Sequence, residues 1–142
     1  MRQIRLVAAA ASLVVAFTLG AAACGGGGSD ATAHEILIDI EPVGTEGSTG
    51  TLSLSKSGET TNVVVDFIVP SGGGQQDAAF YKGTCANFDE ASKLEVGPLE
   101  EGTGALTMET PIEEILNGGY VLIIHKAVDD PTPIGCAAVN VE

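Results

Sequence analysis

The sequence predicts an all-β domain over residues 34–142, folded as an antiparallel Greek-key β-sandwich or barrel with one short helix. Two observations predict this class. Short segments with alternating apolar and polar residues recur along the chain, and clusters of Gly, Ser, Asn and Pro separate them. A helix start is indicated at one place, near residue 112.

Seven segments are predicted to be strands. In the first, residues 34–41, isoleucine occupies every second position of the middle part, which is the period of a half-buried strand. Residues 51–56 and 62–69 lie on either side of the turn Ser57-Gly58-Glu59 and predict a hairpin. The other predicted strands are residues 77–81, which is weaker, 104–109, 120–125 and 135–141.

The single helix is predicted from its flanking residues. Thr110 is a suitable N-cap, Pro111 suits the first helical position, and Glu113 completes a capping box. The glycines of Asn117-Gly118-Gly119 would end the helix. The side chains expected to face the core are Ile112, Ile115 and Leu116.

Residues 1–23 have the anatomy of a lipoprotein signal peptide. Arg2 and Arg5 precede an apolar run over residues 6–19, which is shorter than the roughly 20 residues that a membrane span needs. Ala21-Ala22-Ala23 before Cys24 resembles the lipobox of bacterial lipoproteins, in which the cysteine is acylated. The same alanines also satisfy the rule for general signal peptidase, which would release a soluble protein.

The next segment, residues 24–33, is interpreted as the lipidated Cys24 followed by a glycine-rich tether. About nine flexible residues reach roughly 15 to 18 Å, so the domain would stay close to its membrane. The predicted location is therefore the extracytoplasmic face of the cell membrane, with the membrane itself as a partner through the lipid. Two or more acyl chains on Cys24 would be needed for a durable anchor.

Charge excludes several classes of partner. Without residues 1–23 the chain has four lysines against nineteen acidic residues, a net charge near −15. Nucleic acid is disfavoured because its binding depends on Lys and Arg that neutralise phosphates, and anionic lipid headgroups are repelled. The acidic residues are scattered, which is more typical of a solvated surface than of a cation site.

The cysteines predict one disulfide. With Cys24 assigned to the lipid, Cys85 and Cys136 remain as an even pair in an exported protein, where disulfides persist. Closing a loop of about 50 residues would stabilise the fold by roughly 4 kcal/mol in the chain-entropy model.

Three stretches carry a resemblance to a known family: residues 81–85 (YKGTC), 115–120 (ILNGGY) and 124–130 (IHKAVDD), the last leading to Cys136. In this order they resemble the copper/zinc superoxide dismutase fold, particularly its small bacterial relatives, and more loosely the chordin-type (CHRD) domain. The resemblance covers most of residues 34–142. It implies a Greek-key sandwich in which the second cysteine bonds the first.

The family's metal ligands have no counterparts here. Ala79 and Tyr81 match the family's His-x-His pair, and no histidine lies between Cys85 and Tyr120, where the bridging and zinc ligands should fall. Pro133 matches the arginine that steers superoxide. The resemblance therefore implies a fold without dismutase chemistry, because a cycling copper needs several imidazoles.

His125 has two interpretations. It matches the last copper ligand of the family, so it could be a relic ligand that binds stray copper with Tyr81 or a carboxylate. The alternative, which we prefer, is a strand-end imidazole hydrogen-bonded to the backbone, because one imidazole makes a poor metal site. Asp129-Asp130 is interpreted as a solvated loop, with weak calcium binding as the alternative.

The sequence thus predicts a membrane-anchored lipoprotein whose β-sandwich is a non-catalytic binding or structural module of the cell envelope. We expect no cofactor and no catalytic residue, and the envelope protein or ligand it binds is not identified by the sequence. The first alternative is a degenerate copper-binding protein that uses His125. An unrelated enzyme is disfavoured because the chain has no Ser-His-Asp ordering, no phosphate-binding glycine loop and no thiol in a nucleophile context.

Overall fold

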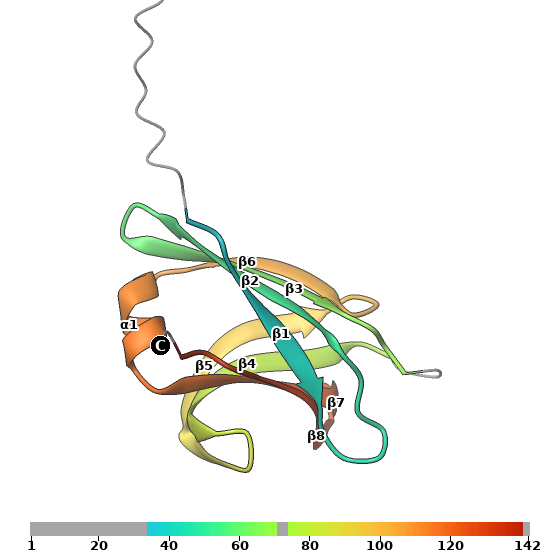
Figure 1. Ribbon diagram of the computed structural model, residues 1–142. Coiled ribbons are helices and arrows are strands. Elements are labelled where there is room, and N and C mark those ends of the chain that lie inside the picture. Colours follow the sequence, from blue (N-terminus) through green and yellow to red (C-terminus); the bar gives the residue numbers. More distant parts are fainter. Residues whose placement is uncertain (1–33, 71–73, 141–142) are drawn as a thin grey trace, which may run out of the picture. The chain divides into compact units, whose positions relative to one another are not determined.

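Eight antiparallel strands and one short helix form the described part of the chain, residues 34–70 and 74–140 of a computed structural model (Figure 1). The predicted signal peptide, Cys24 and the tether lie outside the described residues. The elements are β1 (Ile36–Pro42), β2 (Gly50–Ser57), β3 (Thr60–Phe67), β4 (Gln76–Thr84), β5 (Asn87–Leu99), β6 (Thr103–Met108), α1 (Ile112–Asn117), β7 (Tyr120–Ala127) and β8 (Asp130–Ala138).

The strands form two layers joined into one nearly closed sheet with the order β5-β4-β7-β8-β1-β2-β3-β6. The end of β1 joins the layers, because Glu41 pairs with Cys136 of β8. On the opposite side β5 and β6 meet through the bridge between Glu100 and Thr103. β3 pairs with β6 and β4 with β7, so each pairing skips two strands in a Greek-key pattern. The predicted all-β, antiparallel sandwich or barrel is confirmed.

The main core lies between the two layers and is built by the alternation seen in the sequence. Ile40 of β1 and Leu52 and Leu54 of β2 point inward, where they are almost fully buried. From the other layer, Phe80 and Leu122 complete the same apolar cluster. α1 connects β6 of one layer to β7 of the other and adds Ile112 and Ile115 to this core (Figure 1).

A second, smaller apolar cluster lies on the outer side of β4, β7 and β8. Because of it, β7 is buried on both faces from Tyr120 to His125, which explains its unbroken apolar run. The cluster consists of Ala79, Tyr81, Val121, Ile123 and Cys136, against which Val43, Cys85 and Phe88 are partly buried. The outer face of β4, β7 and β8 therefore holds buried apolar side chains, whereas a solvent-exposed sheet face would be polar.

One strand was not predicted. β5 is the longest strand, with 13 residues, yet its sequence has four charged residues and a Gly97-Pro98 pair that normally ends a strand. It forms because β4 supplies a partner, with shifts in register after Ala78 and after Phe80 that absorb the irregular pattern. Strand ends differ as well: β8 begins at Asp130 and not at residue 135, and β3 ends at Phe67 and not at residue 69.

The helix is where the sequence places it, but the predicted capping box is wrong. Pro111 occupies the N-cap position and no side chain caps the helix by a hydrogen bond. The carbonyl oxygen of Thr110 accepts a hydrogen bond from the Thr61 hydroxyl, so this residue is held by β3. The predicted inward residues are confirmed, since Ile112 and Ile115 are buried and Leu116 packs against them. Within the described residues no helix is both long and apolar enough to cross a membrane.

Candidate functional site

The candidate site lies on the outer face of β4 and β7, where the strand alternation places Asp77, Ala79 and Tyr81 on one side. Their neighbours Ala78 and Phe80 point into the main core. β7 pairs with β4 so that Asp77 lies opposite His125. The sequence-predicted positions Ala79, Tyr81 and His125 are therefore brought onto one face of the sheet.

Asp77 and Lys93 lie beside His125, and Glu95 joins this group through Lys93. The Nδ1 atom of His125 lies 3.7 Å from Oδ2 of Asp77, which is an electrostatic contact beyond hydrogen-bond length. The Lys93 ammonium donates to the same Asp77 oxygen at 3.2 Å and pairs with Glu95 at 2.8 Å. A polar pocket of about 290 Å³ opens over these groups, between β5 and the β7–β8 turn. The positive charge next to these carboxylates therefore comes from a side chain of the protein, Lys93.

Tyr81 forms the apolar wall of this pocket. Its ring lies edge-on to the His125 imidazole, with 5.9 Å between the centroids. The ring is also tilted against Phe88 at 5.0 Å. Only 4 % of Tyr81 is exposed, so its ring is packed and encloses one side of the imidazole.

Burial controls protonation in the cluster. It lowers the pKa of His125 below its usual 6.5, and the Asp77 carboxylate only partly opposes this effect, so the imidazole is neutral at pH 7. Burial likewise raises the pKa of Tyr81, which keeps the phenol protonated. The hydrogen bond to Glu95, followed by that to Asp77, raises the pKa of Lys93, which stays charged at all ordinary pH values. The site thus holds a neutral imidazole beside a permanent cation.

The expected hydrogen bond between His125 and the backbone is not found in the described part of the chain, where its polar neighbour is the Asp77 carboxylate. Pro133 lies opposite His125 in β8, so it does stand beside the candidate site. Asp129 lies in the exposed turn before β8, while Asp130 begins that strand and accepts a hydrogen bond from the Thr132 amide.

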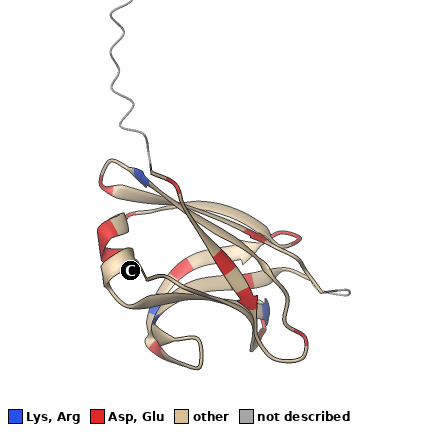
Figure 2. Cartoon of the chain, in the orientation of Figure 1, with Lys and Arg blue, Asp and Glu red and all other residues tan. Residues whose placement is uncertain are grey.

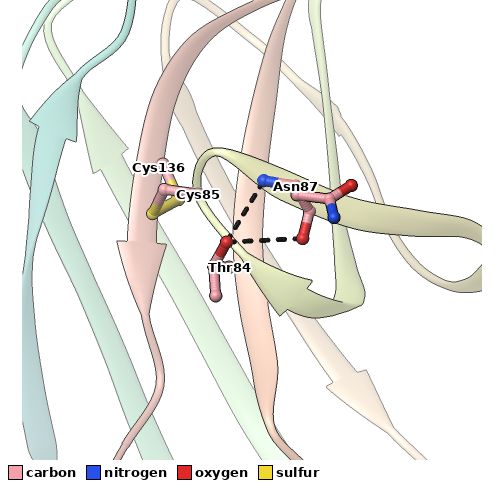
Figure 3. Close-up of a disulfide and its surroundings, with 4 residues drawn as sticks. All are labelled: Thr84, Cys85, Asn87 and Cys136. Carbon is pink, nitrogen blue, oxygen red and sulfur yellow. Dashed lines mark hydrogen bonds between the residues drawn. A yellow bond between two sulfur atoms is a disulfide. The ribbon is translucent and has the colours of Figure 1, made fainter.

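Cys85 and Cys136 lie at disulfide distance, with 1.93 Å between their sulfur atoms (Figure 3). Cys136 belongs to the outer apolar cluster, and Cys85 follows the end of β4. The turn at Cys85 is held by the Thr84 hydroxyl, which accepts a hydrogen bond from the Asn87 amide at 3.1 Å (Figure 3). Gly83 has φ +129° and its missing Cβ would lie 2.5 Å from the Asn87 oxygen, so this turn requires glycine.

Sequence reasoning missed Asp77, Lys93 and Glu95 as site residues. Asp77 could have been found, because it precedes Ala79 and Tyr81 at the two-residue spacing that places side chains on one face. Lys93 and Glu95 could not, because β5 was not predicted and its pairing with β4 brings them to the site.

The residues present do not fit a copper or zinc centre of the dismutase type. One imidazole is available, and the carboxylate beside it is already paired with Lys93. Across residues 34–70 and 74–140 no group of three or more His, Cys, Asp and Glu side chains is arranged to hold a metal ion. Comparison of the chain with known protein families, curated proteins and solved structures finds no match.

Proposed function

We propose that this chain is a membrane-anchored lipoprotein whose β-sandwich is a non-catalytic binding or structural module of the cell envelope. The signal anatomy of residues 1–23, followed by Cys24 and a glycine-rich segment, supports the anchor. The disulfide-distance cysteine pair agrees with an exported protein, because such bonds persist in oxidising compartments.

The observation that carries the non-catalytic assignment is the position of Lys93. Its ammonium lies within 3.2 Å of Asp77 and 2.8 Å of Glu95, so it occupies the side of these carboxylates that a metal cation would need. A bound copper ion would also meet the repulsion of this fixed positive charge. Both carboxylates are thus already paired with a cation from within the chain, and the His125 imidazole packs against Tyr81.

The resemblance to superoxide dismutases is retained as part of the proposal. In its favour, the motifs that carry it converge in space: Tyr81 contacts His125, Pro133 pairs with His125, and Cys85 reaches Cys136. This convergence supports a relation in which the fold persists after the metal ligands are lost. The fold alone does not determine the function, since one fold hosts many functions.

The alternative is a degenerate copper-binding protein that uses His125. The observation in its favour is the pocket in which His125, Asp77, Tyr81 and Glu90 converge, since these supply nitrogen and oxygen donors. For copper to bind there, Lys93 would have to move away from Asp77, so the alternative needs a rearrangement that the first proposal does not.

Elemental analysis tests the two proposals directly. The protein is refolded with copper and zinc, dialysed and assayed for both metals and for superoxide turnover, alongside the His125→Ala and Lys93→Gln variants. We expect no stoichiometric metal and no turnover above that of free copper in the unmodified protein. One tightly held equivalent of copper that is lost in His125→Ala would establish the alternative. Weak copper binding gained only in Lys93→Gln would confirm that this lysine excludes the metal.

The anchor is tested separately. Mass spectrometry of the N-terminus of the native protein should show acyl mass on Cys24, and Cys24→Ser should be released or remain unprocessed. An unmodified Cys24 on the native protein would contradict the lipoprotein assignment.

A further inference from the structure

The outer face of β1, β2 and β3 has an ordered pattern of side chains. Pairing between the strands places Leu37, Ser53 and Val64 in one row across the sheet. In the next row, Asp39 and Asp66 lie on either side of Thr51. We call the outward-facing set the β1–β3 face; its apolar and acidic members are Leu37, Asp39, Glu41, Val64, Asp66 and Ile68.

The apolar side chains of this face are exposed. Leu37 and Ile68 are each 65 % exposed and Val64 is 45 % exposed. The alternation on these strands already buries Leu52, Leu54, Val63 and Val65 in the core, so the outward residues add little to folding. Leu37 and Val64 lie on either side of Ser53, and Ile68 lies beyond the acidic row, so the exposed apolar side chains flank the carboxylates. Exposed apolar side chains with a polar surround are typical of interaction surfaces.

The carboxylates of the face have no cation from the described residues. Asp39, Glu41 and Asp66 line one shallow depression together with Ile68, and none of them forms a salt bridge there. The lysines are engaged elsewhere: Lys56 with Glu113, Lys93 with Asp77, Lys126 with Glu46, and Lys82 over the Tyr120 ring. Figure 2 shows the acidic residues of β1, with the lysines lying on other parts of the fold.

Charge selects among the occupants of such a face. A second copy would place its own carboxylates against these, and two like-charged surfaces repel. An anionic membrane surface is repelled for the same reason. Asp39 and Asp66 are separated by two strand spacings, about 10 Å, a distance that two cationic side chains of one segment can match. A segment with both basic and aliphatic side chains could pair with the carboxylates and cover the apolar side chains of this face.

We propose that the β1–β3 face binds a basic, amphipathic segment of another protein. Lys or Arg side chains of that segment pair with Asp39, Glu41 and Asp66, while its aliphatic side chains cover Leu37, Val64 and Ile68. This surface is separate from the His125 pocket. The proposal rests on the proposed function in one respect, which is that the domain binds another protein. It does not depend on the lipid anchor or on metal content.

The test measures the affinity of the native protein, purified in the form that its cell produces, for a short labelled peptide that contains Lys and Leu. The probe peptides differ in one property each: Glu replaces Lys in one control and Ser replaces Leu in another. Asp39→Asn combined with Asp66→Asn should weaken binding of the Lys/Leu peptide by roughly five- to tenfold at low salt. Leu37→Ser should weaken it further, and added salt should reduce the charge-dependent part.

The matched control removes two negative charges elsewhere. Asp129→Asn combined with Glu114→Gln alters exposed residues outside the face and should leave the affinity within about twofold of the unmodified protein. Equal weakening by this control would show attraction to the net charge alone and would overturn the proposal. So would the absence of binding, or unchanged binding in the Asp39 and Asp66 variant. Metal and acyl analyses are unaffected by these outcomes, so failure here is distinct from failure of the proposed function.

Discussion

On the outer face of β4 and β7, Asp77 and His125 are enclosed and Asp77 is paired with Lys93. On the β1–β3 face the carboxylates are exposed and have no cation from the described residues. Asp77 is 17 % exposed at its side chain and is shared by Lys93 and His125. Asp39 and Asp66 are exposed and form no ion pair with another described residue. Both faces belong to the same eight-stranded sheet, so the difference lies in what covers each of them.

The comparison separates two roles for surface charge. Where the chain supplies its own partner, a substitution should change the free energy of unfolding. Where it supplies none, a substitution should change binding and leave folding nearly untouched. Substitutions on the enclosed side should therefore destabilise the fold, and substitutions on the β1–β3 face should not.

The largest expected effect is loss of the disulfide on the enclosed side. Cys85→Ser combined with Cys136→Ser should lower the free energy of unfolding by about 4 kcal/mol, because the cysteines are 51 positions apart and the open chain gains entropy. Denaturant unfolding of both proteins measures it. A loss below about 1 kcal/mol would show that the outer cluster holds without the bond.

The next effect concerns packing on the two faces. Tyr81→Ala should cost about 3 kcal/mol, because the ring is almost fully buried against Phe88 and His125. Val64→Ala on the β1–β3 face should stay within about 0.5 kcal/mol, because Val64 is 45 % exposed. Thermal and denaturant unfolding give both values. Similar losses for the two variants would contradict the division between the faces.

How far the sequence predicts these faces depends on the element involved. Strands with clean alternation, such as β1 and the β2–β3 hairpin, are predictable because one side of each is buried. β5 is not, because its charged residues and Gly97-Pro98 contradict strand propensity, and only pairing with β4 makes it a strand. His125 and Tyr81 could be named from the sequence, but the partners Lys93 and Glu95 come from β5 and are non-local. The predicted capping box is wrong because the helix begins one residue later, with Pro111 at the N-cap, and the Thr110 carbonyl is instead bonded to Thr61 of β3, a contact that no local pattern reveals.

A smaller effect is a pH dependence of stability that belongs to the enclosed side. Burial lowers the pKa of His125 in the folded state below 6.5, so between pH 6.5 and the lower folded value the unfolded chain binds a proton that the folded chain does not. Stability should therefore fall as the pH drops below about 6.5 and should level off below the folded pKa. More than about one pH unit above 6.5, His125 contributes almost no such dependence.

The His125→Gln variant checks this assignment. Its free energy of unfolding should fall less between pH 7 and pH 5 than that of the unmodified protein, measured in denaturant at each pH. Titration of the imidazole proton signals by NMR gives the pKa itself. A His125 pKa above 6.5 would mean that attraction to Asp77 outweighs burial, and the sign of the predicted pH effect would reverse.

The smallest expected effect is on the open face. Asp39→Asn combined with Asp66→Asn should change the free energy of unfolding by no more than about 0.5 kcal/mol, since neither carboxylate has a partner to lose among the described residues. Any change should be a gain at low salt, because two carboxylates about 10 Å apart repel each other, and it should vanish near physiological salt, where the screening length is about 8 Å. Asp77→Asn is the comparison on the enclosed side, where Lys93 loses one of its two carboxylate partners and stability should fall. Denaturant unfolding at two salt concentrations measures all three proteins. If the Asp39 and Asp66 variant were less stable than the unmodified protein, these carboxylates would stabilise the fold. They would then not be unpaired charges available to a partner.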